Sequence, residues 1–198
     1  MKLVLATSNK GKLQEIKELC SEHEVMVYSE LIDEFEIVED GSSFKQNALI
    51  KARAVFKALK DESVVVIADD SGISVDELGG EPNIYSARYA GVDANDKDNL
   101  LKVVDELKKR EKTGSPAHYT AAIAIVNKDG EFCVHGWMYG DVITTPRGDK
   151  GFGYDPIFIP KGYEKTLGEL ESSVKKEFSH RSKALKLAKI ILREIAKE

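Results

Sequence analysis

The stretch Val64-Val65-Val66-Ile67-Ala68-Asp69-Asp70-Ser71-Gly72 decides the fold of this chain. It begins with a continuous apolar run that is mostly β-branched, and such a run predicts a strand that is buried on both faces. We expect the strand to end abruptly at Asp69, because a pair of carboxylates interrupts the apolar run there. The acidic pair is therefore expected directly after a buried strand, in a turn.

Toward the N-terminus, the sequence predicts a strand and two helices. Leu3–Ala6 is typical of a short buried strand, and it runs into Thr7-Ser8-Asn9 and a helix with an apolar stripe. Ser43 and Gln46 form a capping box, and apolar residues follow at helical spacing, so a second helix is predicted to begin there.

Toward the C-terminus, the sequence predicts a helix, a chain break, a long hairpin and a final helix. These lie at 100–107, at 113–116, at 119–127 with 131–142, and from Ser179 onward. The hairpin follows from Lys128-Asp129-Gly130, because an Asp-Gly pair between two strand-like stretches is a turn signal. Helices that alternate with strands, together with a hairpin, indicate an α/β fold with a mixed sheet.

Composition limits the partners that this chain can have. Its 198 residues are 42% hydrophobic, which suffices for one substantial core, and we expect a single domain over residues 1–198. The 34 acidic and 29 basic residues are mixed along the chain, so no basic field exists to hold nucleic acid. Nothing approaches a signal peptide or a membrane span, and the two cysteines suit a reduced cytoplasmic protein.

The pair Asp69-Asp70 is the strongest local signal for chemistry. Two adjacent carboxylates after a buried strand repel each other and lose hydration unless a cation lies nearby. Mg²⁺ is a good candidate, because it takes hard oxygen ligands and pairs one or two carboxylates with substrate phosphates. Glu39-Asp40-Gly41 is a second acidic loop that could reach the same ion. The alternatives are solvated turn aspartates and an acidic lead-in to the following helix.

Three other segments carry groups that suit a nucleotide. Thr7-Ser8-Asn9-Lys10-Gly11-Lys12 offers hydroxyls, free N–H groups and lysines to phosphate, although it lacks the P-loop spacing. Gly151-Phe152-Gly153-Tyr154-Asp155-Pro156 offers aromatic rings and a carboxylate to a planar base. Ser179-His180-Arg181, with Lys175 upstream, places cations at a helix start, where they call for an anionic or acceptor partner. An ordinary helix cap, a core-filling turn and a structural use are the respective alternatives.

Read together, these segments resemble the inosine triphosphate pyrophosphatase family, also called XTP/dITP diphosphatases, over essentially the whole chain and in the family's order. The resemblance rests on 7–12, 68–72, 78–80, 85–89, 151–156 and 179–181. It implies an elongated α/β fold of two lobes that share a long twisted mixed sheet flanked by helices, with the active site in the cleft between the lobes. It also implies a homodimer, Mg²⁺ as cofactor, and hydrolysis of ITP, dITP and XTP to the monophosphate and pyrophosphate.

The resemblance also implies a role for each matching residue. Asp70 corresponds to the proton acceptor and a metal-site residue, and Glu39 to the second metal carboxylate. Asp69 corresponds to a further metal-site residue that supports them, and both a direct contact with the ion and an indirect one stay open. The nucleotide-binding groups that it implies are Thr7, Ser8, Asn9, Lys10, Gly11, Lys12, Ser71, Phe152, Gly153, Tyr154, Asp155, Lys175, His180 and Arg181. For Gly79-Gly80 and Tyr85–Tyr89, a supporting layer, a lid and a subunit contact all stay open.

A mechanism follows as a hypothesis. Asp70 accepts a proton from the attacking water, while Lys12 and Lys175 neutralise the departing pyrophosphate. Arg181, His180 or a backbone N–H donates to the 6-oxo group of the base, Asp155 accepts from a ring N–H, and Phe152 and Tyr154 stack on the ring. The rival functions are a nucleotide sensor without turnover and a phosphatase or pyrophosphatase with another base preference.

Overall fold

The computed structural model describes residues 2–7, 9–21 and 23–197, apart from the side chains of Lys10 and Leu19. Its strands are β1 (Lys2–Leu5), β2 (Glu24–Val27), β3 (Val65–Val75), β4 (Gly114–Asn127), β5 (Gly130–Ile143) and β6 (Phe158–Pro160). Its α-helices are α1 (Lys10–Leu19), α2 (Phe44–Leu59), α3 (Asp96–Lys109), α4 (Ser172–Phe178) and α5 (His180–Ile195). Short 3₁₀ turns are η1 (Tyr28–Glu30), η2 (Asp76–Leu78), η3 (Asn83–Arg88) and η4 (Asp155–Ile157).

The strands form one mixed sheet in the order β2-β1-β3-β4-β5-β6. Strand β1 pairs in parallel with both β2 and β3, whereas β5 pairs with β6 in the antiparallel sense. The α/β fold with a mixed sheet is confirmed, and β4 and β5 are neighbours joined at the predicted Lys128-Asp129 turn.

Contacts divide the chain into two compact units. Unit 1 contains Met1–Asp70, Ala121–Gly136 and Arg181–Glu198, and unit 2 contains Ser71–Thr120 and Trp137–His180. Strands β3, β4 and β5 contribute residues to both units. The division falls between Asp70 and Ser71, so the acidic pair belongs to unit 1, and the aromatic loop at 151–156 belongs to unit 2.

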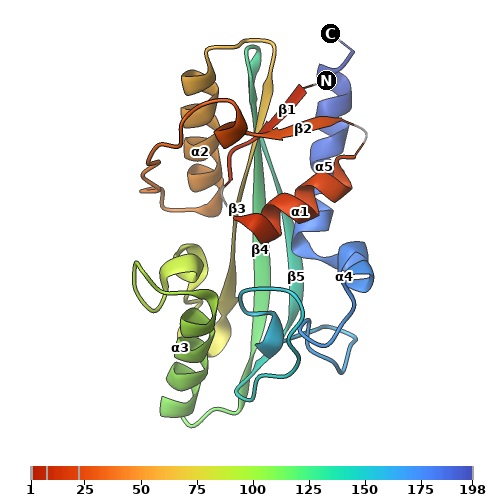
Figure 1. The fold of residues 1–198 in the computed structure, drawn as a ribbon. Helices are drawn as coiled ribbons and strands as arrows, with labels where there is room; N and C mark the ends of the chain where they lie inside the picture. The colour runs from red at the N-terminus through yellow and green to blue at the C-terminus, as the bar shows by residue number, and fades with distance from the viewer. Residues whose placement is uncertain (1, 8, 22, 198) are drawn as a thin grey trace. The chain divides into compact units, whose positions relative to one another are not determined.

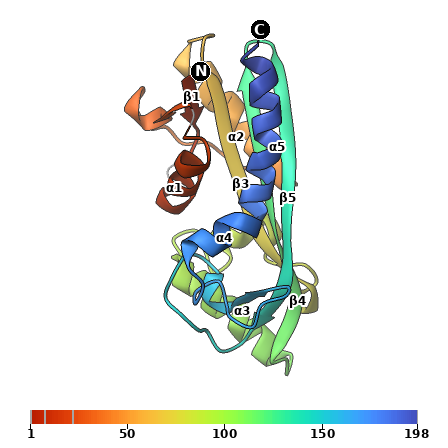
Figure 2. The same ribbon diagram turned by 90° about the vertical axis from the view of Figure 1, so that its right-hand side faces the viewer.

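In unit 1, helices cover both faces of the strands. Leu5 and Ile67 point toward one face, where they share a buried core with Ile16 of α1 and Leu185 of α5. Val66 and its neighbours of the same parity point to the other face and are equally buried. Figures 1 and 2 show α2 on the side of the strands opposite to α5. Helix α2 turns its apolar stripe inward, so both faces of β3 are covered in this unit.

In unit 2, the apolar stripe of α3 packs into a second core. Leu100, Val103 and Leu107 of this helix share that core with Ile73 of β3 and with Tyr154 of the aromatic loop. Asn95 caps α3, because its side chain accepts from the N–H of Asp98, whose own carboxylate accepts from the N–H of Asn95. The cap and the apolar stripe together fix the helix beside the loop.

The structure corrects the predicted boundaries of the two central strands. Strand β3 does not end at Asp69 but continues through the acidic pair to Val75, because the buried Arg181 and the half-buried Lys12 compensate Asp69 there. Strand β4 begins at Gly114, within the predicted break, and Pro116 is exposed in it. The capping box of α2 is half formed: Ser43 accepts from the N–H of Gln46, whose side chain accepts instead from Ser42.

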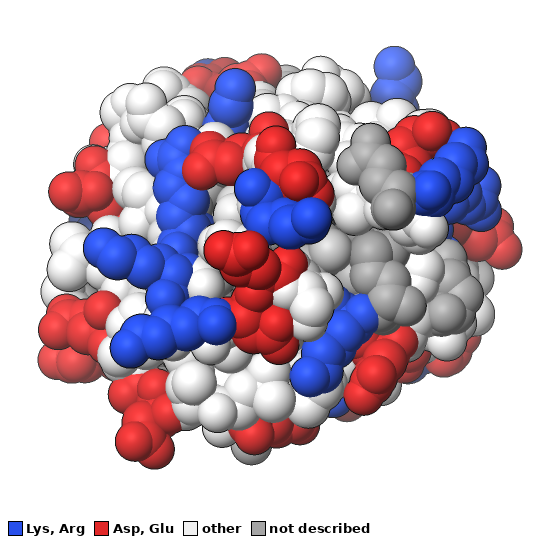
Figure 3. Space-filling view, turned by 90° about the horizontal axis from the view of Figure 1, so that it is seen from above, with Lys and Arg blue, Asp and Glu red and all other residues white. Residues whose placement is uncertain are grey.

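Over the described residues, no helix is both long and apolar enough to cross a membrane. On the face drawn in Figure 3, lysine and arginine side chains are interspersed with aspartate and glutamate side chains.

Candidate functional site

The acidic pair lies inside strand β3, so its two carboxylates point to opposite faces of the sheet. Asp69 has the parity of Ile67 and points toward the face covered by α1 and α5. Asp70 has the parity of Val66 and points toward the face covered by α2. Both side chains are buried.

Asp69 belongs to a group of four charges that we call the neutral cluster: Asp69, Lys12, Glu15 and Arg181. The Asp69 carboxylate accepts from Arg181 Nε at 2.9 Å and pairs with Lys12 Nζ at 2.7 Å. Arg181 also donates through Nη1 to Glu15 of α1. Burial disfavours ionisation of Asp69, but Arg181 and Lys12 outweigh burial and hold its pKa well below the ordinary value. Two positive and two negative groups balance one another here.

Asp70 belongs to a group of three charges that we call the acidic cluster: Asp70, Glu39 and Lys51. Lys51 Nζ lies 3.0 Å from Asp70 Oδ1 and 2.7 Å from Glu39 Oε2. The other oxygen of Asp70, Oδ2, is buried and has no hydrogen-bond partner. Burial raises the pKa of the Asp70 carboxyl, Lys51 and Lys12 oppose the rise, and the Glu39 carboxylate adds to it. The two carboxylates carry more negative charge than the single ammonium balances. The net charge of the acidic cluster therefore favours the binding of a further cation.

The start of helix α2 positions Glu39. Gly41 donates its N–H to Asn47 Oδ1 at 2.9 Å, which folds the acidic loop back onto the helix. A side chain at Gly41 would lie 2.6 Å from that same oxygen, so only glycine allows this approach. Lys51 lies one turn after Asn47 in α2 and is half-buried. Burial disfavours its charged form, but Asp70 and Glu39 outweigh burial and raise the pKa of Lys51.

The junction between β1 and α1 carries the predicted phosphate groups. Asn9 caps α1 by accepting from the N–H of Lys12 at 3.0 Å, and its own N–H donates to Thr7 Oγ1 at 3.2 Å. Gly11 lies in the first turn of α1. Ser8 and the side chain of Lys10 lie outside the described residues. The Lys12 ammonium contacts Asp69, so this junction and the acidic strand lie together in unit 1.

The loop from Gly151 to Asp155 in unit 2 is organised around the Asp155 carboxylate. Its Oδ2 accepts from the N–H of Phe152 at 3.0 Å and from Lys175 Nζ at 2.7 Å. The Lys175 ammonium also lies 4.8 Å from the centre of the Phe152 ring. Gly151 has φ of 76°, and a side chain there would collide with Asp155. Phe152, Asp155 and Lys175 thus form one compact group.

The remaining predicted residues are buried to different degrees. Tyr154 is 5% exposed and donates its hydroxyl to the carbonyl of Ser86, so its ring belongs to the core of unit 2. His180 is buried and stacks on Tyr119, with ring centres 4.6 Å apart. Ser71 is half-buried and is the first residue of unit 2. Gly153 donates its N–H to Asp96.

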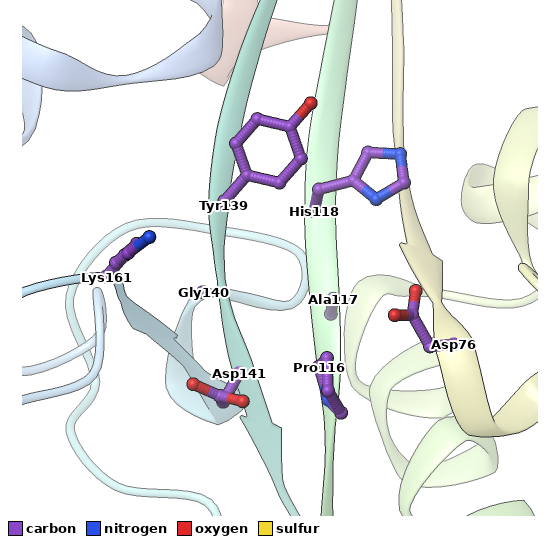
Figure 4. A pocket seen from close by; sticks show the side chains of 8 residues that line it. All are labelled: Asp76, Pro116, Ala117, His118, Tyr139, Gly140, Asp141 and Lys161. Atoms are coloured by element: carbon purple, nitrogen blue, oxygen red, sulfur yellow. The ribbon is translucent and has the colours of Figure 1, made fainter.

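A cavity of about 300 Å³ lies elsewhere in unit 2, and none of the predicted site residues lines it. Figure 4 shows the rings of His118 and Tyr139 on neighbouring strands, with Asp76 on one side and Lys161 on the other. The predicted nucleotide groups are therefore separate from the walls of this cavity.

The structure gathers the predicted residues into groups within each unit. Asp70 and Glu39 come together through Lys51, whereas Asp69 turns away from Glu39 to Arg181 and Lys12. Among the described residues, no group of three or more His, Cys, Asp or Glu side chains is arranged to hold a metal ion. Sequence reasoning missed Lys51. A lysine three residues after Ala48 and four before Val55, on an apolar helix stripe, signals a cation that is at least partly buried. It also missed Glu15, for which no comparable signal exists.

The fold and the site define an α/β protein with an acidic cluster on a central strand and a lysine-bearing strand–helix junction in the same unit. The chain belongs to the Ham1 family, which it matches over residues 3–190. The dITP/XTP pyrophosphatase of Sulfurimonas denitrificans is 67% identical over 98% of this chain and 100% of that protein. A dITP/XTP pyrophosphatase of Campylobacter jejuni is 52% identical over the full length of both chains.

Solved structures also match this chain over nearly its whole length. The Ham1 protein of Staphylococcus aureus superposes with a TM-score of 0.86 at 36% identity, over 98% of this chain and 99% of that one. A nucleoside-triphosphatase / dITP/XTP pyrophosphatase of Mycobacterium abscessus superposes with a TM-score of 0.73 at 36% identity, over 95% and 98% of the two chains. The mixed α/β fold is that of the family.

Proposed function

We propose that this protein is a nucleoside triphosphate pyrophosphatase that hydrolyses ITP, dITP and XTP to the monophosphate and pyrophosphate and so removes them from the nucleotide pool. The observation that carries the proposal is the full-length similarity to proteins named dITP/XTP pyrophosphatases, at 52–67% identity. The acidic cluster supports turnover over simple binding, because a nucleotide sensor needs lysines and a base pocket but has no use for two converging carboxylates.

We propose Mg²⁺ as the cofactor, with Glu39 and Asp70 as the residues that hold it. Two features of the acidic cluster fit this ion: the carboxylates already share a cationic group, Lys51, and Asp70 Oδ2 is buried without a partner. Mg²⁺ takes one or two carboxylates together with waters and phosphate oxygens, so a third carboxylate is not required. When bound, it would neutralise triphosphate charge and make water more acidic. Asp69 would contribute by holding Lys12 and Arg181.

Residues of the protein supply the proton acceptor and a positive charge for the phosphates. Asp70 accepts a proton from the attacking water. Lys12 places a positive charge at the start of α1, where phosphate oxygens also meet free backbone N–H groups. The chemical step therefore depends on groups of unit 1.

Base selection is assigned to unit 2. Phe152 stacks on the base, and Asp155 accepts from a ring N–H while Lys175 holds its carboxylate. The 6-oxo group of inosine or xanthine needs a donor, since a buried donor that faces the 6-amino group of adenine would lose its partner. Arg181 donates to Asp69 and Glu15, so His180 or a backbone N–H is the better candidate for this donor.

One assay separates the possible functions. The full chain is incubated with Mg²⁺ and ITP, XTP, dITP, ATP or GTP, and released pyrophosphate and orthophosphate are measured separately. We expect pyrophosphate from the first three nucleotides and much less product from ATP and GTP. Orthophosphate as the main product would indicate a phosphatase, and tight binding without product would indicate a sensor.

Two further expectations from the family resemblance are also proposals: the protein acts as a homodimer, and it acts in the cytoplasm. Sedimentation equilibrium of the full chain tests the first, with twice the chain mass as the expected result. Imaging of a tagged protein in its source cells tests the second.

A further inference from the structure

The segment Tyr85–Tyr89 follows the acidic strand, and its role stays open at the level of sequence. In the structure, most of it lies in the turn η3, and buried polar groups fasten it. Asn99 of α3, which is 2% exposed, accepts from the N–H of Ala90 and donates to the carbonyl of Ala87. Ser86 accepts from the N–H of Ile73 at 2.9 Å. A segment held by buried bonds to both a helix and a strand is a fixed support for its neighbours and not a lid.

The phenol of Tyr154 joins the aromatic loop to this support. Its hydroxyl donates to the carbonyl of Ser86 at 2.7 Å, and both residues are buried. Burial, with nearby Tyr89 and Asp96, raises the pKa of the Tyr154 phenol, so the hydroxyl stays a donor over the whole working pH range. Because the ring is packed in the core of unit 2, Tyr154 does not offer an open face to a base.

The groups that would meet the base lie on either side of Tyr154. Phe152 and Asp155 share the loop with it, and the Asp155 carboxylate is held by the N–H of Phe152 and by Lys175. A second tie runs from the N–H of Gly153 to the Asp96 carboxylate of α3, at 2.9 Å and at the surface. The loop thus has one buried anchor, at Tyr154, and one exposed anchor, at Gly153, and the base-facing groups Phe152 and Asp155 lie on either side of these two residues.

We propose that Tyr154 is a positioning residue for base recognition: its hydroxyl fixes the loop to Ser86, so that Phe152 and Asp155 meet the purine in one arrangement. This inference rests on the proposed pyrophosphatase function and deepens it. The Tyr85–Tyr89 segment supports the loop through the carbonyl of Ser86. The hydrogen bond from Tyr154 affects binding of the base and not the chemical step.

The test is Tyr154→Phe, which keeps the ring and removes only the donor. We expect KM for XTP to rise about five- to tenfold, the range set by one buried hydrogen bond, while kcat changes less than about twofold. The preference for XTP over ATP in kcat/KM should fall by a similar factor. Tyr139→Phe is the matched control, because it removes a phenol hydroxyl from an exposed ring of the same unit, beside a cavity that none of the predicted site residues lines. Its kinetic constants should equal those of wild type.

A second variant keeps the inference testable if Tyr154→Phe folds poorly. Asp96→Ala removes the exposed anchor, and it should raise KM by about twofold with kcat unchanged. In a double-mutant cycle, Tyr154→Phe should add little to the effect of Asp155→Asn, because the tyrosine acts through the loop that holds this carboxylate.

The outcomes separate the inference from the proposed function. Wild-type protein that releases no pyrophosphate from XTP overturns the function, and this inference with it. If the wild-type protein turns over XTP, each of these results overturns the inference alone: an unchanged KM in Tyr154→Phe, a loss confined to kcat, an equal rise of KM in Tyr139→Phe, an unchanged KM in Asp96→Ala, or full additivity with Asp155→Asn.

Discussion

The neutral cluster and the acidic cluster begin at neighbouring residues of one strand, yet their charges balance differently. In the neutral cluster, Asp69 meets Arg181 and Lys12, and every charge is compensated. In the acidic cluster, Asp70 and Glu39 share one ammonium, and a buried carboxylate oxygen is left without a partner. The comparison teaches that a compensated buried charge holds the structure together, whereas an under-compensated one is available to bind a cation or a proton.

The strand geometry creates this difference. Successive side chains of a strand point to opposite faces, so Asp69 meets α1 and α5 while Asp70 meets α2. An acidic pair in a loop could place both carboxylates on one ion. An acidic pair in a strand assigns one carboxylate to packing and leaves the other for chemistry.

The largest effect is expected for a change in the acidic cluster, and it tests whether this cluster carries out the chemical step. Asp70→Asn removes the proposed proton acceptor, and pyrophosphate release from XTP should fall about 10²- to 10⁴-fold while nucleotide binding persists. Its unfolding free energy should stay within about 1 kcal/mol of wild type, because the carboxylate is only partly compensated. Steady-state kinetics and urea unfolding measure the two quantities. Turnover close to wild type would remove Asp70 from the chemical step.

The second largest effect is expected for a change in the neutral cluster, and it tests whether this cluster stabilises the fold. Asp69→Asn removes the carboxylate that pairs with the buried Arg181 and with Lys12, and the unfolding free energy should fall by about 3–5 kcal/mol. Urea unfolding at neutral pH measures this loss. Asp76→Asn, at an exposed site on the same stretch of chain, should change stability by less than about 0.5 kcal/mol. If both variants lose the same stability, the neutral cluster is not the support described above.

Much of the fold can be predicted from local sequence, because apolar periodicity and caps act over a few residues. The run at Val64–Ala68, the cap at Ser43 and the Asp-Gly turn each specify an element without information from elsewhere. Strand β6 and helix α4 are too short to show a period. Their positions depend on packing against segments that are distant in sequence.

The candidate site could be predicted in its residue types but not in its pairing. The sequence places Asp69 and Asp70 after a strand, because two carboxylates in a buried strand are unfavourable in isolation. The partner that makes this possible, Arg181, lies 112 residues further along the chain. Local patterns carry no information about a contact at that separation. Lys51 is different, because its place on an apolar stripe could have revealed it.

The third prediction sharpens the comparison through pH. A raised pKa means that folded Asp70 binds its proton more tightly than the unfolded chain does, so its contribution to stability is lost as pH rises from 3.8 through the raised value. Asp69 has a lowered pKa, so its contribution is present above 3.8 and is lost as pH falls. In EDTA, the stability of Asp70→Asn relative to wild type should therefore increase with pH, by up to about 1.4 kcal/mol per unit within that window.

The relative stability of Asp69→Asn should move in the opposite direction as the pH rises. Urea unfolding of the three proteins between pH 2 and pH 8 measures both slopes, because the Asp69→Asn slope lies below pH 3.8 and the Asp70→Asn slope lies above it. Slopes of the same sign would contradict the difference in compensation between the two clusters.

The smallest effect concerns the cation that the acidic cluster already contains. Lys51→Met leaves Asp70 and Glu39 without their shared ammonium, and stability in EDTA should fall by about 1 kcal/mol, a modest value because Glu39 is 30% exposed. For a chain of this size, the loss lowers Tm by about 2–4 °C. Mg²⁺ should then raise Tm more in this variant than in wild type, because the ion replaces a missing positive charge. Lys45→Met, at an exposed position of the same helix, should respond to Mg²⁺ as wild type does. An equal Mg²⁺ response in Lys51→Met would mean that the ion and the ammonium act at different places, and that the unpaired Asp70 oxygen does not mark the metal site.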